Sequence, residues 1–307
     1  MSREFGKVAV LGLGLLGGSV GLAVRQRQLA ECVAAASRSQ APLKQALADG
    51  VADEIGDIAD CVQGAELVVL ASPVGAMPKI LSEAAPHLAA GTLVTDLGSI
   101  KGALVDTLPG LLPSGVEYIG AHPMAGGHQK GAVHARADLF EGAACVISAS
   151  PSASEESVAR VALFWTSLGA KVLFRGAEDH DQEVAWISHV PHALAFAYAH
   201  ALQKAPASAS ELAGPGFRDF TRIARSDPAM WSEILNTNRK AVAGVLQSVG
   251  ASLAELGRAI EAGDQSAQES FLAQGSDALA ASTSESAESA RAASRPNVRS
   301  GGVNPEI

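Results

Sequence analysis

The sequence predicts an α/β protein in which a doubly wound sheet comes first and an all-helical domain follows. Two observations predict this fold. From about residue 7 to residue 174, short apolar runs alternate with segments of helical period, as in a parallel sheet with crossover helices. From about residue 178 to residue 274, long Ala- and Leu-rich segments of helical period replace the strand pattern. We therefore expect two domains, over residues 1–176 and 177–275.

The first domain is expected to contain buried strands, because its apolar runs are short and bounded by glycine or polar residues. In chain order these runs are KVAVLGL, CVAAAS, ELVVLAS, TLVTDLG, YIGAHP, ACVISAS and KVLFRG. Segments between them, such as APLKQALADG and GAMPKILSEAAPHLA, have the period of helices. Together they indicate alternating strands and helices.

The second domain is expected to be built from long helices, and a different composition follows it. The helical segments are DQEVAWISHVPHALAFAYAHALQKA and NRKAVAGVLQSVGASLAELGRAIEAG. From residue 276 the chain is rich in Ser and Ala, with no large apolar residue between Leu279 and Val298. Such a segment buries too little apolar surface to fold by itself, so we expect a disordered tail over residues 276–307.

Composition and charge exclude several classes of protein. Apolar residues make up 48% of the 307 residues and charged residues 18%, as in ordinary globular proteins. The net charge of -9 argues against nucleic acid as a main partner. No segment offers about 18 uninterrupted apolar residues, so we expect no membrane span. The N-terminus has no apolar signal region, which predicts a cytoplasmic protein. The 3 cysteines lie far apart and indicate neither a metal site nor a disulfide framework.

A glycine motif lies between the first expected strand and a helical segment. Gly12, Gly14 and Gly17 form the pattern G-x-G-x-x-G, which is typical of Rossmann-type dinucleotide-binding domains. Gly12 permits a tight turn, Gly14 lets the backbone approach a pyrophosphate, and Gly17 lets the helix pack against the strand. The helix start at Leu15 and Leu16 offers N–H groups to phosphates. The alternative is a glycine-rich turn that binds no ligand.

The end of the second expected strand bears on the choice of cofactor. An NAD-binding domain usually has an acidic residue there, which accepts a hydrogen bond from the ribose 2′-OH. This chain has Ser37, Arg38 and Ser39 instead. A guanidinium flanked by hydroxyls suits a 2′-phosphate, so we expect NADP to be favoured, with NAD possible. The alternative is that Arg38 is a solvated charge and Ser39 only a helix cap.

Polar residues follow three other strands, at the edge of the sheet where open α/β sheets bind ligands. Ser72 and Pro73 close one strand near the expected nicotinamide. Ser99 follows the next strand, in a segment that also holds Asp96 and Lys101, and could orient a substrate hydroxyl.

The third strand end offers two histidines, His122 and His128. Imidazole can accept a hydroxyl proton near neutral pH, so His122 is a candidate general base. Taken alone, His122 is equally well a structural histidine.

Six segments occur in the order found in one enzyme family: GLGLLGGS, DLGSIKG, GAHPMAGGHQKG, LFEGA, DHDQEVAWISHVPHA and GFRDFTRIARSDPAMW. Together they resemble the prephenate and arogenate (cyclohexadienyl) dehydrogenases of tyrosine biosynthesis, the TyrA family, over roughly residues 8–246. The resemblance implies NAD(P)-dependent oxidative decarboxylation of prephenate to 4-hydroxyphenylpyruvate, of arogenate to tyrosine, or of both. It implies that His122 is the base on the ring hydroxyl and that Ser99 bonds this hydroxyl.

The resemblance also implies substrate-binding residues in the second domain. Arg222 matches a carboxylate-binding arginine, and His189 matches a histidine that faces the substrate side chain. Gly216 and Trp231 are further candidates. Simpler alternatives exist for each: a surface ion pair of Arg222 with Asp219, packing of His189 on a helix bent at a proline, and packing of Trp231.

His128 stands where many family members carry an acidic residue, near the substrate side chain. Its presence bears on the choice between prephenate and arogenate without deciding it.

Apolar surface in HALAFAYAHAL and AVAGVLQSVGASLAEL exceeds what one short bundle needs. With the resemblance, it predicts a homodimer formed through the helical domain.

Two alternative functions are a dehydrogenase of another type and a sensor that is not an enzyme. A dehydrogenase of the β-hydroxyacid type would carry a catalytic lysine on a helix of the second domain. After Lys171 the chain has only Lys204 and Lys240, and neither lies in a glycine-rich motif. A sensor that only binds the cofactor would keep the glycines without the set Ser99, His122, His189 and Arg222.

Overall fold

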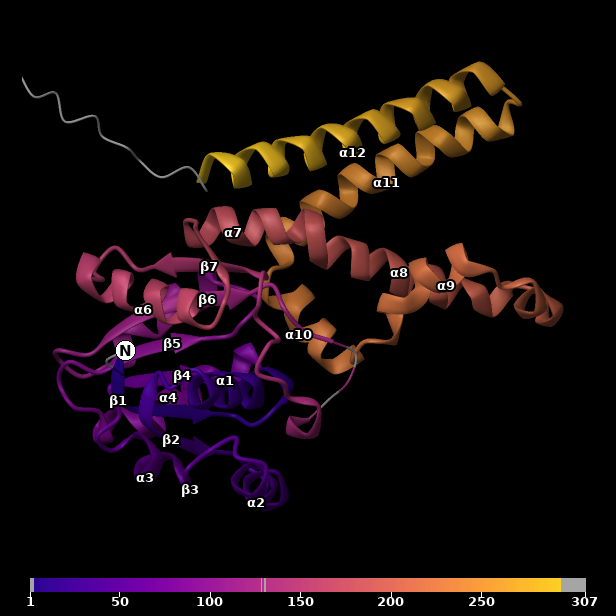
Figure 1. The fold of residues 1–307 in the computed structure, drawn as a ribbon. Helices are drawn as coiled ribbons and strands as arrows, with labels where there is room; N and C mark the ends of the chain where they lie inside the picture. Colours follow the sequence, from indigo (N-terminus) through magenta and orange to yellow (C-terminus); the bar gives the residue numbers. More distant parts are fainter. Residues whose placement is uncertain (1–2, 128, 130, 294–307) are drawn as a thin grey trace, which may run out of the picture. The chain divides into compact units, whose positions relative to one another are not determined.

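The computed structural model of the protein describes residues 3–127, 129 and 131–293. Its described residues form an eight-stranded sheet in the order β3-β2-β1-β4-β5-β6-β7-β8 (Figure 1). The strands are β1 (Phe5–Leu11), β2 (Ala30–Ala36), β3 (Glu54–Gly56), β4 (Leu67–Leu70), β5 (Leu93–Asp96), β6 (Glu117–Pro123), β7 (Ala144–Ala149) and β8 (Lys171–Phe174). The seven expected strands are all present. The additional strand, β3, has only three residues, too few to give a sequence pattern.

The sheet is parallel except at one pair of strands. Strand β7 runs antiparallel to β6, with His122 opposite Val146. In the described part of residues 124–143, the connection holds only the short 3₁₀ helix η4 (Ala132–His134). Without a crossover helix the chain returns directly and pairs antiparallel. The expected parallel, doubly wound sheet is confirmed except at this pair, which is antiparallel.

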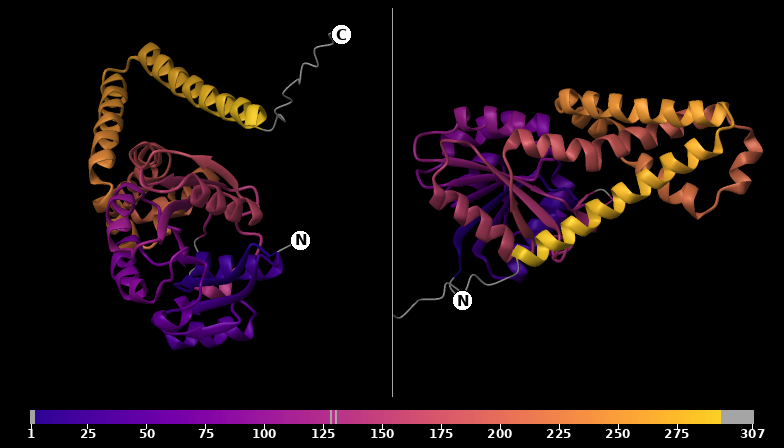
Figure 2. Two further views of the ribbon diagram at one scale, coloured as in Figure 1. Left: turned by 90° about the vertical axis from the view of Figure 1, so that its left-hand side faces the viewer. Right: turned by 90° about the horizontal axis from the view of Figure 1, so that it is seen from above.

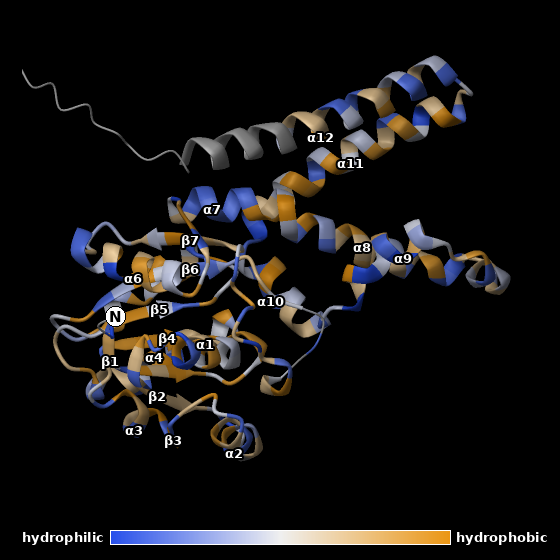
Figure 3. Ribbon diagram, in the orientation of Figure 1, coloured by the Kyte–Doolittle hydropathy of each residue, from blue (hydrophilic) through white to orange (hydrophobic). Residues whose placement is uncertain are grey.

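Helices cover both faces of the sheet, as a doubly wound sheet requires (Figures 1 and 2). Val8 and Val10 of β1 face a core that also contains residues of α1 (Leu15–Gln26), α2 (Gln40–Ala48) and α6 (Glu155–Ser167). The alternate residues Ala9 and Leu11 face the opposite core. That second core is completed by α3 (Ile58–Val62), α4 (Met77–Ala84) and α5 (Gly102–Thr107). Strand β4, with the sequence LVVL in the middle of the sheet, is accordingly apolar throughout (Figure 3).

The helices that follow the sheet up to Val245 belong to the same compact unit as the sheet. They are α7 (Ala177–Val184), the π-helical turn η5 (Ala185–His189), α8 (Val190–Ala201), α9 (Pro215–Thr221) and α10 (Pro228–Thr237). Further 3₁₀ turns are η1 (Val74–Ala76), η2 (Ala85–His87), η3 (Pro109–Leu111), η6 (Leu202–Lys204), η7 (Ala207–Leu212) and η8 (Arg222–Arg225). Among the described residues, no helix is both long enough and apolar enough to cross a membrane.

The second compact unit begins at Leu246, within α11 (Arg239–Glu261), and includes α12 (Gln265–Ala293). Residues 276–293 are therefore helical, which differs from the disordered tail expected from residue 276. This stretch is rich in alanine, the best helix former, and contains no proline. The rest of the expected tail, residues 294–307, lies outside the described residues.

Candidate active site

The glycine motif has the backbone geometry that its spacing predicts. Gly12 has φ +120°, and a Cβ atom there would lie 2.5 Å from the carbonyl oxygen of Ala71. A Cβ atom on Gly17 would lie 2.0 Å from the carbonyl oxygen of Gly12, so only glycine lets α1 pack this closely. A Cβ atom on Gly14 would meet nothing within 4 Å. The open backbone at Gly14 therefore leaves room for a ligand at the start of α1.

The first turn of α1 adds free donors to this opening. Gly14 is the N-cap residue, and the first bond of the helix runs from the N–H of Gly18 to the carbonyl of Gly14. The N–H groups of the half-buried Leu15 and Leu16 precede that bond and have no helix carbonyl to accept them. These residues fit the pyrophosphate of a dinucleotide, which takes hydrogen bonds from such groups.

The three residues after β2 are accessible to a ligand. Ser37 is half-buried, whereas Arg38 and Ser39 are exposed. Ser39 is the N-cap residue of α2, but its side chain makes no capping hydrogen bond. Arg38 makes no ion pair with another residue of the described part of the chain, so its guanidinium is available to an anion.

The loop after β4 connects the sheet to the helical part of the same unit. Ser72 is half-buried and Pro73 is exposed, and the Ser72 hydroxyl donates to its neighbour's carbonyl oxygen at 3.3 Å. The backbone N–H of Gly75, in η1, donates to the carboxylate of Glu233 on α10. This contact fixes the loop that follows β4 to helix α10.

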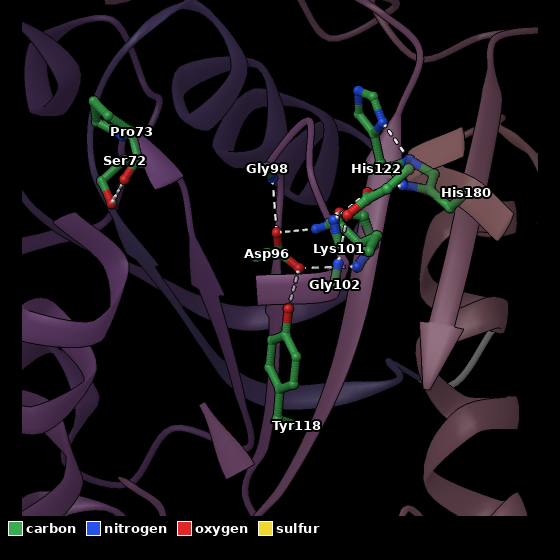
Figure 4. Close-up of polar contacts among 11 residues, drawn as sticks. Ser72, Pro73, Asp96, Gly98, Lys101, Gly102, Tyr118, His122 and His180 are labelled. Carbon is green, nitrogen blue, oxygen red and sulfur yellow. Dashed lines mark hydrogen bonds and ion pairs between the residues drawn. The ribbon is translucent and has the colours of Figure 1, made fainter. Parts of the chain in front are cut away.

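Asp96, at the end of β5, is the centre of a buried hydrogen-bond network (Figure 4). Its carboxylate accepts from the N–H of Gly98 at 2.8 Å, the hydroxyl of Tyr118 at 2.8 Å and the N–H of Ala121 at 2.9 Å. It also accepts from the ammonium of Lys101, which is fully buried. Burial lowers the pKa of Lys101, although the carboxylate of Asp96 opposes that shift. Burial together with Asp96 raises the pKa of Tyr118 well above its usual value.

This network fixes the strand end that carries His122. Strands β5 and β6 pair only at their starts, where Leu93 and Val94 lie opposite Glu117 and Tyr118. Further along, the Asp96–Lys101 pair connects the two strands. Asp96 accepts from the N–H of Ala121, and Lys101 donates to the carbonyl oxygen of Ala121 at 2.8 Å. The backbone N–H and C=O of Ala121, the residue before His122, are therefore both held in place.

His122 is the first member of a chain of three hydrogen-bonded side chains, and Figure 4 shows its contact with the second member, His180. Its Nδ1 atom lies 2.8 Å from Nε2 of His180 on α7, and Nδ1 of His180 lies 2.8 Å from a carboxylate oxygen of Asp181. His122 and His180 are buried, with 9% and 1% of their surface exposed. Burial, and then the neighbouring His180, hold the pKa of His122 well below 6.5. His122 is therefore neutral at pH 7.

The carboxylate determines which nitrogen of each histidine carries the proton. A carboxylate only accepts hydrogen bonds, so Nδ1 of His180 donates to Asp181, and when the His180 ring carries a single proton its Nε2 accepts. Nδ1 of His122 must then donate to His180. The unprotonated nitrogen of His122 is Nε2, which is the form that a general base requires.

Asp181 also connects helix α7 to the segment after Ser99. Its two carboxylate oxygens accept from the backbone N–H groups of Lys101 at 2.8 Å and Gly102 at 2.9 Å, at the start of α5. Ser99 is half-buried, and its hydroxyl makes no hydrogen bond with another described residue. Its neighbour Ile100 is buried in a cluster with Trp231 of α10.

His189 and Trp231 form a second cluster on the helices. His189 closes the π-helical turn η5, and Pro191 follows near the start of α8. Proline has no N–H to continue the helical ladder, which accounts for the irregular turn. Trp231 is buried, stacks on His192 with ring centroids 3.7 Å apart, and lies 6.0 Å from the ring of His189. Burial lowers the pKa of His189 to about 4.

In the described part of the chain, the remaining candidate substrate-binding residues were not found in the His122 cluster or in the His189 cluster. Gly216 in α9 and Arg222 at the start of η8 are exposed, on elements that contact α8. His128 lies outside the described residues. The structure thus brings His122 together with residues after β5 and on α7, and His189 together with Trp231.

Sequence reasoning did not assign a role to His180, Asp181, Asn238 or Glu233. Asp96 and Lys101 were identified only as suitable groups near Ser99. A signal existed for His180 and Asp181, because a histidine next to a carboxylate in DHDQ comes soon after the last strand, which ends at Phe174. None existed for Asn238 and Glu233, whose partners lie far away in the sequence.

Comparison with known proteins identifies the family. The family model described as the nucleotide-binding domain of prephenate dehydrogenase matches residues 20–174, and the model of its dimerization domain matches residues 176–274. The chain belongs to the prephenate dehydrogenase family. Among relatives of this family, the cyclohexadienyl dehydrogenase of Zymomonas mobilis is 30% identical over 265 residues, which cover 85% of this chain and 90% of the relative. The prephenate dehydrogenase of Bacillus subtilis is 32% identical over 244 residues, which cover 78% of this chain and 66% of the relative.

Solved prephenate dehydrogenase structures have the same fold as this chain. Prephenate dehydrogenase from Aquifex aeolicus, in complex with hydroxyphenyl propionate and NAD+, superposes with a TM-score of 0.84 at 28% identity. That match covers 91% of this chain and 99% of the other. Arogenate dehydrogenase from Synechocystis has a TM-score of 0.77 at 29% identity, with 89% and 98% of the two chains covered. These matches do not favour the alternative of a β-hydroxyacid-type dehydrogenase.

Proposed function

We propose that the protein catalyses the NAD(P)-dependent oxidative decarboxylation of a cyclohexadienol, prephenate, arogenate or both, in tyrosine biosynthesis. The observation that carries this proposal is the buried chain His122–His180–Asp181, which leaves Nε2 of His122 unprotonated at a strand end of a dinucleotide-binding fold. The family membership and the relatives named above support the choice of substrate.

The dinucleotide supplies the acceptor for the hydride that leaves ring carbon C4. His122 Nε2 takes the proton of the C4 hydroxyl as this hydride leaves. The bond between the ring and its carboxylate then breaks, carbon dioxide leaves, and the electron pair of that bond makes the ring aromatic. The proton on His122 returns to the resulting phenolate oxygen, so the step consumes no net proton. Aromatisation favours the reaction, and the residues mainly supply alignment and one base.

The other candidate residues take supporting roles in this proposal. The Ser99 hydroxyl is available to bond the C4 hydroxyl, and Arg222 is proposed to bind a substrate carboxylate through its planar fork. Ser72 and Pro73 are proposed to contact the nicotinamide. Gly216 and His128 stay candidates for the substrate side-chain end.

NADP is proposed as the favoured cofactor, with NAD possible. The support is the sequence Ser37-Arg38-Ser39, which has no carboxylate to repel a 2′-phosphate and an exposed guanidinium to pair with it. A homodimer through the helical domain is proposed because residues 176–274 match a dimerization domain. A cytoplasmic location stays a prediction from the sequence.

One assay tests the proposed function. Reduction of NADP and of NAD is followed with prephenate, with arogenate and with a 3-hydroxy acid as separate substrates. We expect turnover with at least one cyclohexadienol and none with the 3-hydroxy acid. Turnover of the 3-hydroxy acid alone would favour the β-hydroxyacid type, and no turnover at all would favour a sensor.

A further inference from the structure

His189 has one bonded and one unbonded ring nitrogen, both inside the protein. The side chain is 1% exposed, and its Nδ1 atom lies 3.1 Å from Nδ2 of Asn238. Its Nε2 atom is buried and has no hydrogen-bond partner among the described residues. A buried polar atom of this kind calls for a partner that the chain does not supply.

The hydrogen bonds of Asn238 decide where the proton of His189 lies. The side chain of Asn238 is within 2.7 Å of the backbone carbonyl oxygen of Asp181, which can only accept. The atom facing it must therefore be the amide nitrogen, and an NH₂ group can only donate. The same NH₂ group faces Nδ1 of His189, so that nitrogen accepts and carries no proton. Since burial holds the pKa of His189 at about 4, the ring is neutral at pH 7 and its proton is on Nε2.

A second buried donor without a partner belongs to a neighbouring ring. The indole N–H of Trp231 also has no hydrogen-bond partner among the described residues, and its ring centroid lies 6.0 Å from that of His189. Trp231 packs against Ile100, the residue after Ser99. The two donors therefore belong to the side of the site where the reacting hydroxyl is proposed to bind.

We propose that Asn238 is a positioning residue: its amide holds His189, already a candidate substrate-binding residue, as an Nε2–H donor that acts with the indole N–H of Trp231, a second such candidate, on one carboxylate of the substrate. A carboxylate has two acceptor oxygens and suits two neighbouring donors. Asp181 then sets the hydrogen-bonding roles of both His122 and His189, and the two roles are opposite. Its carboxylate leaves His122 as an acceptor, and its backbone carbonyl orients the amide that makes His189 a donor. The assignment of the ligand rests on the proposed function, whereas the position of the proton does not.

The position of the proton is tested by NMR on the full-length protein without ligands, with ¹⁵N in the histidine side chains. The signals of His189 are identified by their loss in His189→Gln. At pH 7 we expect a protonated Nε2 and an unprotonated Nδ1. The opposite pattern in the wild-type protein would overturn the proposal, whatever the variants do.

Asn238→Asp tests whether Asn238 sets this pattern. A carboxylate can only accept, so Nδ1 of His189 should gain a proton, giving either the other neutral form or the imidazolium. Asn236→Asp is the matched control, because Asn236 is exposed on the neighbouring turn and receives the same charge. An unchanged His189 pattern in Asn238→Asp would overturn the positioning role.

Kinetics test the substrate contact separately. Trp231→Phe keeps an aromatic ring but removes the N–H. It and Asn238→Asp should each raise KM for the cyclohexadienol by about 10–100-fold, the range for a lost hydrogen bond to a charged group. The fall of kcat at acid pH, which reports His122, should stay where it is in the wild type. Unchanged KM in both variants would overturn the contact, whereas a wild-type protein that turns over neither cyclohexadienol would overturn the proposed function instead.

Discussion

Single side chains determine the chemistry proposed for this site, and their surroundings determine the protonation of each. His122 is neutral because it is buried beside His180, and its free nitrogen is Nε2 because Asp181 lies at the other end of the chain. Much of this could not be predicted from the sequence. The motif around His122 predicted a base, but His180 lies 58 residues away, and only the fold brings the two rings together.

At the cofactor site, Arg38→Ala should weaken binding of NADP and leave binding of NAD nearly unchanged. The exposed guanidinium is proposed to pair with the 2′-phosphate, and losing a charge-assisted contact costs about 1.5–3 kcal/mol. Titration of the protein with each dinucleotide measures this. Equal weakening for both dinucleotides, or a wild type that binds NAD more tightly, would contradict the proposed preference.

At the substrate site, Arg222→Ala should raise KM strongly, with a smaller effect on kcat, if the guanidinium binds a substrate carboxylate. Arg222→Lys should restore the wild-type KM only in part, because an ammonium lacks the bidentate fork. Steady-state kinetics with the preferred cyclohexadienol measures both. A KM that does not change in Arg222→Ala would leave Arg222 with a surface role only.

At the scale of elements, the ends of strands and the starts of helices bring the site together. The alternation of apolar runs predicted the doubly wound sheet, and the glycine spacing predicted the geometry at Gly12 and Gly17. Strand β3 was missed because it has only three residues. The antiparallel direction of β7 was missed because it depends on whether a crossover helix connects β6 to β7. The role of α7 was missed because its partner, the start of α5, is about eighty residues earlier in the chain.

Helix α7 supports α5 through one carboxylate, and Asp181→Asn tests this. Two backbone N–H groups at the start of α5 donate to Asp181, and an amide can accept only through one oxygen. We expect the variant to lose about 0.5–2 kcal/mol of stability, the usual cost of a weakened helix cap. Denaturant unfolding, with Asp179→Asn on the exposed side of α7 as the control, measures the loss. Equal stability of the two variants would contradict the capping role.

At the scale of the whole molecule, the family match predicts self-association. Residues 176–274 match a dimerization domain, and Trp186, Ile187 and Tyr198 are exposed on η5 and α8. Large apolar side chains at the surface of these elements are typical of an interface.

We expect light scattering to give the mass of a dimer at micromolar concentration, twice the 31.2 kDa of one chain. Ile187→Glu should shift the protein toward the monomer, because it places a charge in the proposed interface. Leu163→Glu, at an exposed apolar position on α6, is the control and should leave the mass unchanged. A wild-type monomer at this concentration would refute the dimer.

The central claim is that His122 is the general base, and the pH dependence of kcat for wild type and His122→Asn tests it most directly. The neutral imidazole is the active form, and burial lowers its pKa, so wild-type activity should persist as pH falls and decline only below pH 6.5. His122→Asn keeps a donor toward His180 but cannot take a proton. It should lower kcat by about 10²–10⁴-fold and abolish this acid decline, while His128→Asn keeps it. If His128→Asn abolishes the decline and His122→Asn retains it, the base has been assigned to the wrong histidine.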